Sequence, residues 1–269
     1  MIELKPEQYL LAESFFTGKK QYIPALAVLH GNYPGRVFAD RLVDPSAAVV
    51  WATDRWMYFE GDMEQAETLR QFAAFVENTA VPDCELRNER WFEVYTGDYS
   101  GLDRFLRSGI KRLEVLKHRE SSYVLNLEKF TALPELIIPG PAGQLRVEIG
   151  EYPVLEDGPG HPAAVNKRFQ QMTRTGAAVL RGEEMLALCR NNGLMLDREY
   201  FVDTDTFAAE ERGKGYAMLA AATLIRYYLA QGKHPLWETT HDNLPSHRLA
   251  LKLGFEPMED YPVYAFVLK

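Results

Sequence analysis

Residues 210–229, EERGKGYAMLAAATLIRYYL, place an arginine and two glycines in front of a long alanine-rich segment with a helical pattern. A glycine inside a helix costs about 1 kcal/mol relative to alanine, so Gly213 and Gly215 need an explanation. The first turn of a helix has unpaired backbone N–H groups and a partial positive charge, which together attract an anion. Glycines let a diphosphate group approach those N–H groups, and Arg212 and Lys214 add positive charge.

The same stretch also has a simpler interpretation, a glycine-rich turn between a strand and a helix that binds no ligand. Its pattern, Arg-x-x-Gly-x-Ala from Arg212 to Ala217, is short, and glycine and alanine are common residues. The stretch is neither a P-loop nor a dinucleotide fingerprint, because both require further residues at fixed positions. The interpretation therefore depends on the neighbouring segments.

Those neighbouring segments favour a ligand. YFVDTDTF (residues 200–207) precedes the glycines as a strand with alternating faces, and WETTHDNLPSHRLALKLGF (residues 237–255) follows as a strand and a second helix. This order resembles the GNAT superfamily of acyl-CoA-dependent N-acyltransferases. Its diphosphate loop and its second motif are matched in residue type and spacing by Arg212, Gly215, Ala217, Asn243, Ser246 and Leu253-Gly254-Phe255.

The resemblance implies an N-acetyltransferase that transfers an acetyl group from acetyl-CoA directly to a primary amine of a small molecule, such as an antibiotic or another metabolite. In this family the strand before the loop binds the pantetheine arm through its main chain, the loop holds the diphosphate, and the asparagine lies near the thioester. The cofactor-binding residues implied are Phe207, Ala209, Arg212, Gly213, Lys214, Gly215, Tyr216, Ala217, Asn243 and Ser246. No metal is implied.

Direct transfer to an amine requires a group that accepts a proton from the amine. Strand alternation places Asp203 and Asp205 on one face. Carboxylates are costly to bury, so two of them on one face of a central strand indicate a cleft, although a solvated edge strand would also explain them. Glu238 and His241 follow on the next strand, where a histidine often has a structural role. The candidates rank as Asp205, Asp203, Glu238 and His241.

The chain departs from the commoner family pattern at one position. Many members carry a tyrosine seven residues after the asparagine to protonate the leaving thiolate, and Ala250 stands there. The acid is therefore unassigned. Water, Tyr216 or a residue of the first half would serve, or the thiolate leaves unaided, because a thiol with a pKa near about 8.5 is a tolerable leaving group. Two other functions stay open: acetylation of a protein or peptide amine, and a non-catalytic acyl-CoA-binding sensor.

The pattern of the whole chain predicts a layered α/β protein with two domains. Proline and glycine gather in LPELIIPGPAG (residues 133–143), which suggests domains at 1–130 and 131–269. GNYPGRVFADRLVDPSAAVVW (residues 31–51) resembles two-part GNAT proteins grouped with the zwittermicin A resistance acetyltransferase. The first half lacks a diphosphate loop, so it is expected to be a degenerate GNAT-like domain in front of a catalytic GNAT domain.

Apolar periodicity and turn residues predict the individual elements. In the first half they indicate helical structure over 6–30, an antiparallel meander over 36–62 and a helix over 63–79. In the second half they indicate strands at 144–149, 177–181, 184–191, 198–207, 235–240 and 261–269, and helices at 163–172, 213–230 and 246–254.

Composition narrows the class of protein. The 269 residues are 46% hydrophobic and carry a net charge of −8 without a block of Lys or Arg, which argues against nucleic acid as a partner. No apolar run reaches the roughly 20 residues that cross a bilayer. Cys84 and Cys189 are far apart and suit free thiols in a reducing compartment. We therefore expect a cytoplasmic monomer or homodimer that acts away from membranes.

Overall fold

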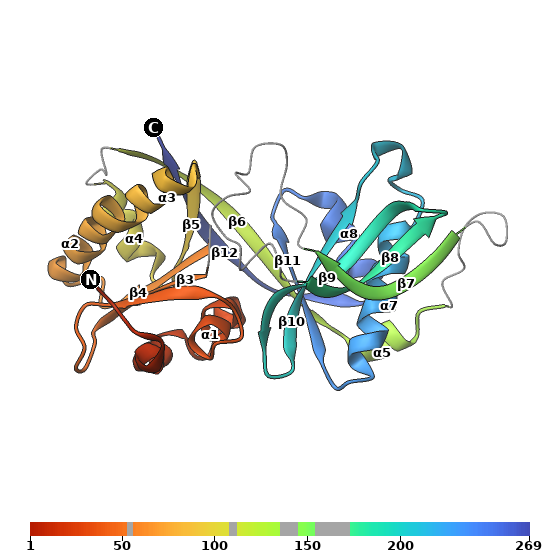
Figure 1. The fold of residues 1–269 in the computed structure, drawn as a ribbon, viewed down its shortest axis with the longest axis horizontal. Helices are drawn as coiled ribbons and strands as arrows, with labels where there is room; N and C mark the ends of the chain where they lie inside the picture. Colours follow the sequence, from red (N-terminus) through yellow and green to blue (C-terminus); the bar gives the residue numbers. More distant parts are fainter. Residues whose placement is uncertain (53–55, 108–111, 135–144, 154–172) are drawn as a thin grey trace. The chain divides into compact units, whose positions relative to one another are not determined.

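The protein is described from a computed structural model, in which residues 1–52, 56–107, 112–134, 145–153 and 173–269 are placed (Figure 1). The helix expected over 163–172 lies outside the described residues. The chain's internal contacts divide it into two compact units. Among the described residues, the first unit contains those of 1–119 and 261–269, and the second contains those of 120–156 and 166–260.

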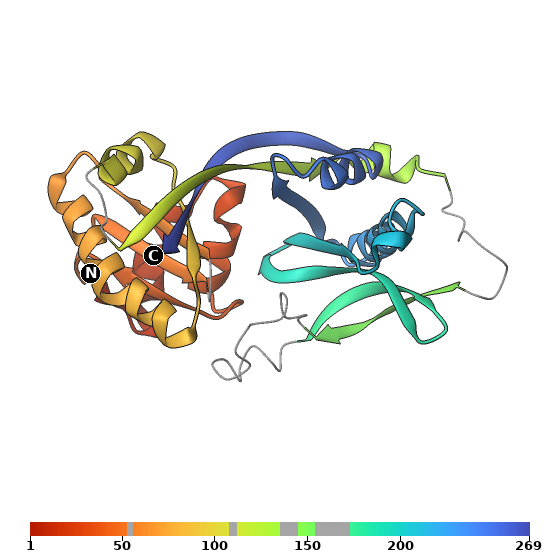
Figure 2. The ribbon, with the colours of Figure 1, turned by 90° about the horizontal axis from the view of Figure 1, so that it is seen from above.

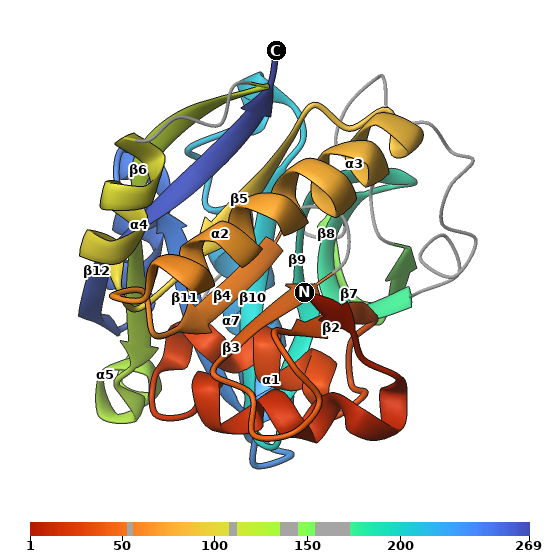
Figure 3. The same ribbon diagram turned by 90° about the vertical axis from the view of Figure 1, so that its left-hand side faces the viewer.

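The first unit is a sheet with helices on its faces. Its strands β2, β3 and β4 form the expected antiparallel meander, and β5 then pairs parallel to β4. Helices α2 and α3 connect β4 to β5 across one face (Figure 3). The elements are β1 (Ile2–Glu3), η1 (Pro6–Phe16), η2 (Lys20–Tyr22), α1 (Ile23–Leu29), β2 (Gly35–Ala39), β3 (Ala47–Ala52), β4 (Trp56–Gly61), α2 (Ala66–Phe75), the π-helical η4 (Val76–Ala80), α3 (Val81–Arg87), β5 (Trp91–Tyr95) and α4 (Tyr99–Arg107).

Helices pack against both faces of this first sheet. All six residues of β3 are buried, because α1 packs on it and the apolar stripe of α2 fills the other face. The aromatic core on the α2 side contains Phe59, Phe72, Phe92 and Phe266. Phe59 and Phe72 are stacked with ring centroids 3.9 Å apart. The unit therefore has its own hydrophobic core.

The second unit repeats this plan. Four strands, β7 to β10, pair antiparallel in chain order, and β11 then pairs parallel to β10. Helix α7 makes the crossover and covers β8, β9 and β10 on one face (Figure 2). The elements are α5 (Leu127–Thr131), β7 (Leu145–Pro153), β8 (Thr173–Arg181), β9 (Glu184–Leu196), β10 (Glu199–Thr206), η5 (Ala209–Glu211), α7 (Tyr216–Leu229), β11 (His234–Thr240) and α8 (Leu244–Lys252). The layered α/β fold expected from the sequence is thus confirmed.

Two long strands contribute residues to both units. Strand β6 (Leu113–Leu125) begins in the first unit, and its residues 120–124 pair antiparallel with β11 in the second. Strand β12 (Phe255–Leu268) begins in the second unit, and Tyr264–Val267 pair with β5 in the first. The units are therefore not two contiguous pieces of chain, and a cut between residues 130 and 131 falls inside α5.

Across the part of the chain that the structure describes, no helix is long and apolar enough to cross a membrane. The longest is α7, with 14 residues.

Candidate active site

Strands β10 and β11 separate partway along their length. Their parallel pairing covers Glu199 with His234, Tyr200 with Pro235 and Phe201 with Leu236. Among the described residues no pair follows, although β10 continues to Thr206 and β11 to Thr240. We call residues 202–206 and 237–240 the fork. Backbone N–H and C=O groups inside a sheet need partners, so the inner edges of the fork suit an extended ligand that carries amides.

The predicted anion loop lies between η5, which follows β10, and the start of α7. Gly213 has a φ of +77° and Gly215 a φ of +90°, and a Cβ built on either would meet no atom within 4 Å. Both glycines therefore have the left-handed backbone that favours glycine and face open space. Arg212 and Lys214 are exposed beside them. The first turn of the 14-residue α7 is thus approachable, and the residues present fit a diphosphate group.

An ion-pair cluster that the sequence analysis missed fixes this loop. The buried carboxylate of Glu211 accepts hydrogen bonds from Arg181 at 3.0 and 3.1 Å and from Lys214 Nζ at 3.0 Å. Arg181 also donates to the hydroxyl of Tyr216, at 3.4 Å. The Arg181 hydrogen bond, followed by that of Lys214, lowers the pKa of Glu211 to about 2. Arg181 lies 30 residues earlier in the chain, so local pattern gave no signal for it.

Replacing Glu211 with glutamine should destabilise the protein in a pH-dependent way. Because the pKa of Glu211 falls from 4.5 to about 2 on folding, its carboxylate stabilises the folded state fully above pH 4.5. That contribution is lost as the pH falls from there toward 2. The melting temperature of Glu211→Gln should therefore lie below that of the wild type at pH 7, and the gap should narrow below pH 4.5. Glu210→Gln, at the exposed neighbouring position, is the control; a gap independent of pH would contradict this account.

The two aspartates of β10 share one face, as strand alternation predicted. Tyr200 and Val202 pack into the core under α7, so Asp203 and Asp205 lie on the opposite face. Asp203 accepts hydrogen bonds from the buried Arg190 at 2.8 and 2.9 Å. These hydrogen bonds hold the Asp203 carboxylate in place beside Arg190. Asp205 is exposed, which keeps it the first candidate for the base.

The second prong of the fork adds a third carboxylate to that face. Phe201 lies on the same face of β10 as the two aspartates, and it pairs with Leu236 of β11. Glu238 lies two residues after Leu236, so its side chain is on that same face of the sheet. Glu120 of β6 pairs with Thr240 on this face and is 6% exposed. Sequence reasoning missed Glu120, because its strand comes from the first half of the chain. Together these residues form an acidic face at the fork.

His241 lies just past the end of β11, at the protein surface. Its Nδ1 is 3.3 Å from Ser121 Oγ and 3.7 Å from a carboxylate oxygen of Asp260. These contacts connect the loop to β6 and β12. A structural role of this kind was the alternative weighed for His241, and its role in proton transfer stays a prediction.

Asn243 and Ser246 fix the start of α8 beside the fork. Asn243 is the N-cap, and its Oδ1 accepts a hydrogen bond from Ser246 N at 3.3 Å. Ser246 Oγ accepts another from Trp237 Nε1 at 3.0 Å. The two motif residues thus have structural roles that the sequence did not indicate, and their contact with a cofactor stays a prediction.

Phe207 and Ala209, predicted to bind the pantetheine arm through their main chain, each make a main-chain hydrogen bond within the protein. Phe207 N–H donates to Leu186 O at 3.2 Å, and Ala209 O accepts from Arg212 N at 3.2 Å. These two groups are already used inside the protein. The contact of either residue with a pantetheine arm stays a prediction. Ala217, also predicted to bind the cofactor, lies in the first turn of α7.

The corresponding turn of the first unit does not fit a diphosphate. After β4 the chain carries Asp62 and Glu64, and the carboxylate of Asp62 accepts hydrogen bonds from Glu64 N and Gln65 Nε2. Met63 is 2% exposed in the core, and a Cβ built on Gly101 would lie 2.5 Å from Met63 Cβ. The turn is acidic and filled, as expected of a degenerate half.

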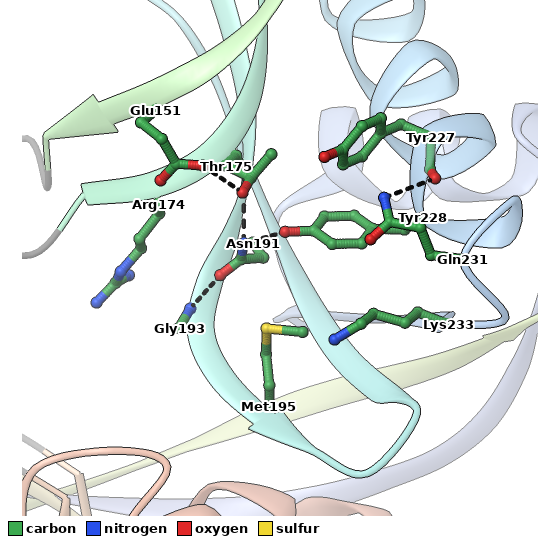
Figure 4. Close-up of a pocket in the computed structure, with 10 residues that line it drawn as sticks. All are labelled: Glu151, Arg174, Thr175, Asn191, Gly193, Met195, Tyr227, Tyr228, Gln231 and Lys233. Atoms are coloured by element: carbon green, nitrogen blue, oxygen red, sulfur yellow. Dashed lines mark hydrogen bonds between the residues drawn. The ribbon is translucent and has the colours of Figure 1, made fainter.

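A cavity of about 360 Å³ lies at the other end of α7 (Figure 4). It is lined by Glu151, Arg174, Thr175, Asn191, Gly193, Met195, Tyr227, Tyr228, Gln231 and Lys233. Asn191 donates to the hydroxyl of Tyr228, and Thr175 donates to Glu151 at 2.6 Å. None of the predicted site residues lines this cavity. Within the described ranges, no group of three or more metal-ligating side chains comes together.

Comparison with known proteins points to the family that the two motifs resemble. Residues 166–264 match the family model of the GNAT acetyltransferases. An uncharacterized N-acetyltransferase, YdfB, of Bacillus subtilis strain 168 is 23% identical over 271 residues, which span 97% of either chain. Over residues 166–264 the chain is therefore similar to the GNAT acetyltransferases, the family that the two motifs resemble.

Solved structures show the same fold over nearly the whole length. A GCN5-related N-acetyltransferase-like protein from Streptococcus suis aligns with a TM-score of 0.64 at 19% identity, covering 97% of this chain and 98% of that one. A tandem GNAT protein from the clavulanic acid biosynthesis pathway aligns with a TM-score of 0.63 at 11% identity, covering 98% and 97%. The two-part, GNAT-like architecture is therefore confirmed.

Proposed function

We propose that the protein transfers the acetyl group of acetyl-CoA directly to a primary amine of a small molecule. The similarity of residues 166–264 to the GNAT acetyltransferases, and of the whole chain to an N-acetyltransferase, supports this proposal. The observation that carries the proposal is the open glycine loop at the end of a strand fork. Acetyl-CoA, when bound, supplies the acetyl group as a reactive thioester. The acceptor class draws on the resemblance of residues 31–51 to two-part GNAT proteins grouped with the zwittermicin A resistance acetyltransferase.

The loop would bind the nucleotide end of acetyl-CoA. The N–H groups in the first turn of α7 and the side chains of Arg212 and Lys214 suit a diphosphate. Glu211 holds the Lys214 ammonium at 3.0 Å, which positions this cation before any ligand arrives. The fork would pair with the amides of the pantetheine arm.

The acidic face of the fork suits a cationic amine. Asp205, Asp203, Glu238 and Glu120 place negative charge there, which attracts an ammonium group. An amine attacks a carbonyl carbon only after it has lost a proton. Asp205, exposed on the face opposite α7, would accept that proton directly or through water.

Asp205→Asn tests this assignment. Wild-type protein should release coenzyme A thiol from acetyl-CoA in the presence of members of a panel of small primary amines. Asp205→Asn should lower kcat by about 100-fold, at the low end for a general base, with the Kd for acetyl-CoA unchanged. Asp203→Asn should have a smaller effect on kcat, because Arg190 holds that carboxylate.

Asp197→Asn is the matched control, since Asp197 is exposed in the turn before β10 and has a φ of +50° that asparagine also adopts. Its turnover should equal that of the wild type. Binding of acetyl-CoA without transfer to any amine of the panel would contradict the proposed function. Full turnover by Asp205→Asn would remove only this residue from the mechanism.

A further inference from the structure

The position of the family's acidic tyrosine holds an alanine that lies in the core. Ala250 on α8 is 0% exposed and packs with Trp237 and Phe255. Side chains on a helix lean toward its N-terminus, so a hydroxyl carried at position 250 would lie beside the preceding turn, level with Ser246 and His247. An acid that replaces this tyrosine is therefore expected at that level of α8.

The hydroxyl of Tyr123, on strand β6, lies beside this turn of α8. Tyr123 Oη is hydrogen-bonded to His247 Nδ1, and the two rings meet edge to face with centroids 5.7 Å apart. Tyr123 lies on β6 and pairs with Trp237, the first residue of β11 inside the fork. The tyrosine is 6% exposed, so its ring is held by the core.

The second nitrogen of His247 fixes the direction of this hydrogen bond. Nε2 lies 3.0 Å from the backbone oxygen of His241. A carbonyl oxygen only accepts hydrogen bonds, so Nε2 carries a proton. In the neutral ring Nδ1 is then the acceptor, and Tyr123 donates to it. In the protonated ring Nδ1 donates to Tyr123, whose own proton can point elsewhere.

We propose that Tyr123 is the acid that protonates the departing sulfur of coenzyme A, and that His247 then returns a proton to Tyr123. This inference rests on the proposed function. As the amine nitrogen forms its bond to the carbonyl carbon and the C–S bond breaks, Tyr123 gives its hydroxyl proton to the sulfur. It takes the Nδ1 proton from imidazolium His247, which becomes neutral. Asp205 passes to solvent the proton that the amine lost before the attack, and the nitrogen gives its second proton to water once the N–C bond has formed. His247 is partly exposed and regains a proton from solvent, so each transfer releases one proton overall.

The charged groups around the pair support this role. Burial, and after it the charge of Asp260, raises the pKa of Tyr123, so the hydroxyl keeps its proton at neutral pH. The ring of His241 lies 6.1 Å from that of His247, and a carboxylate oxygen of Asp260 lies 3.7 Å from His241 Nδ1.

Tyr123→Phe tests the proposal with two measurements. In steady-state transfer, kcat should fall by about 10- to 100-fold while the KM for acetyl-CoA stays within about twofold, as expected for a lost acid. In the second measurement, coenzyme A bound without any acceptor is titrated and its thiolate is followed by ultraviolet absorbance. The thiol should ionise at higher pH in Tyr123→Phe than in the wild type, because the hydroxyl that stabilises the thiolate is gone.

Tyr228→Phe is the matched control, because it removes another buried, hydrogen-bonded tyrosine hydroxyl near the far end of α7. Its kcat and thiol titration should match the wild type. His247→Asn, which removes the proton source, should also lower kcat, and it decides the matter if Tyr123→Phe does not fold. Wild-type kcat and an unchanged titration in the folded variant would overturn the role of Tyr123. Wild-type protein that neither binds coenzyme A nor transfers acetyl groups would instead overturn the proposed function.

Discussion

A chain that begins at residue 131 is expected to be insoluble and unable to bind acetyl-CoA, although it contains both GNAT-like motifs, at residues 212–217 and 243–255. It lacks β6, whose residues 120–124 pair with β11. The outer side of β11 would then present unpaired N–H and C=O groups, which promote aggregation. The fragment also loses Tyr123 and most of α5 with Phe130, two members of the core under α7 and α8. Burying such an aromatic side chain is worth about 1.5 to 3 kcal/mol.

Supplying the missing strand as a separate chain is the control. Residues 1–134 and 135–269, expressed together, contain every described element of the second unit between them. This pair should be soluble and bind acetyl-CoA, as measured by soluble yield and by calorimetry. If residues 131–269 alone were soluble and bound the cofactor as tightly as the full chain, β6 would not be required, and the predicted boundary at 130/131 would be a functional one.

Strands β6 and β12 each contribute residues to both units. For this reason the sequence predicted the positions of helices and strands better than the boundaries of the two units. The pattern of RLEVLKHRESSYVLNL (residues 112–127) is compatible with a strand, but periodicity carries no information about which strand it pairs with. The proline- and glycine-rich stretch at 133–143 therefore looked like the boundary of a domain. Contacts instead divide the chain between residues 119 and 120 and assign its last nine residues to the first unit.

Within the candidate site, the sequence predicted features that depend on neighbouring residues, but it did not predict contacts between residues far apart in the chain. The glycines of the loop could be recognised from the sequence because backbone positions with a positive φ favour glycine. The shared face of Asp203 and Asp205 followed from strand alternation. The partners of these residues could not be predicted, because Arg190 and Arg181 lie on other strands. Arg190 pairs with Asp203, and Arg181 pairs with Glu211 and so helps to hold the loop.

Gly215→Ala is expected to weaken acetyl-CoA binding by about 1,000-fold, since losing two hydrogen bonds to a charged group costs about 4 kcal/mol. The space beyond Gly215 is open, and a Cβ there would stand where a diphosphate must approach the first turn of α7. Calorimetric titration with acetyl-CoA measures the Kd directly. The substitution also strains the backbone, because Gly215 has a φ of +90°. A lower melting temperature alone is therefore not evidence about the ligand.

Gly232→Ala separates strain from ligand binding. Gly232 follows the C-terminus of the same helix, has a φ of +71°, and likewise faces open space within 4 Å. Both variants should lose about 1 kcal/mol of stability, because alanine resists the left-handed backbone conformation. Only Gly215→Ala should lose the cofactor. Equal affinity for acetyl-CoA in the two variants would mean that the first turn of α7 does not bind the diphosphate, and the cofactor would have to be held elsewhere.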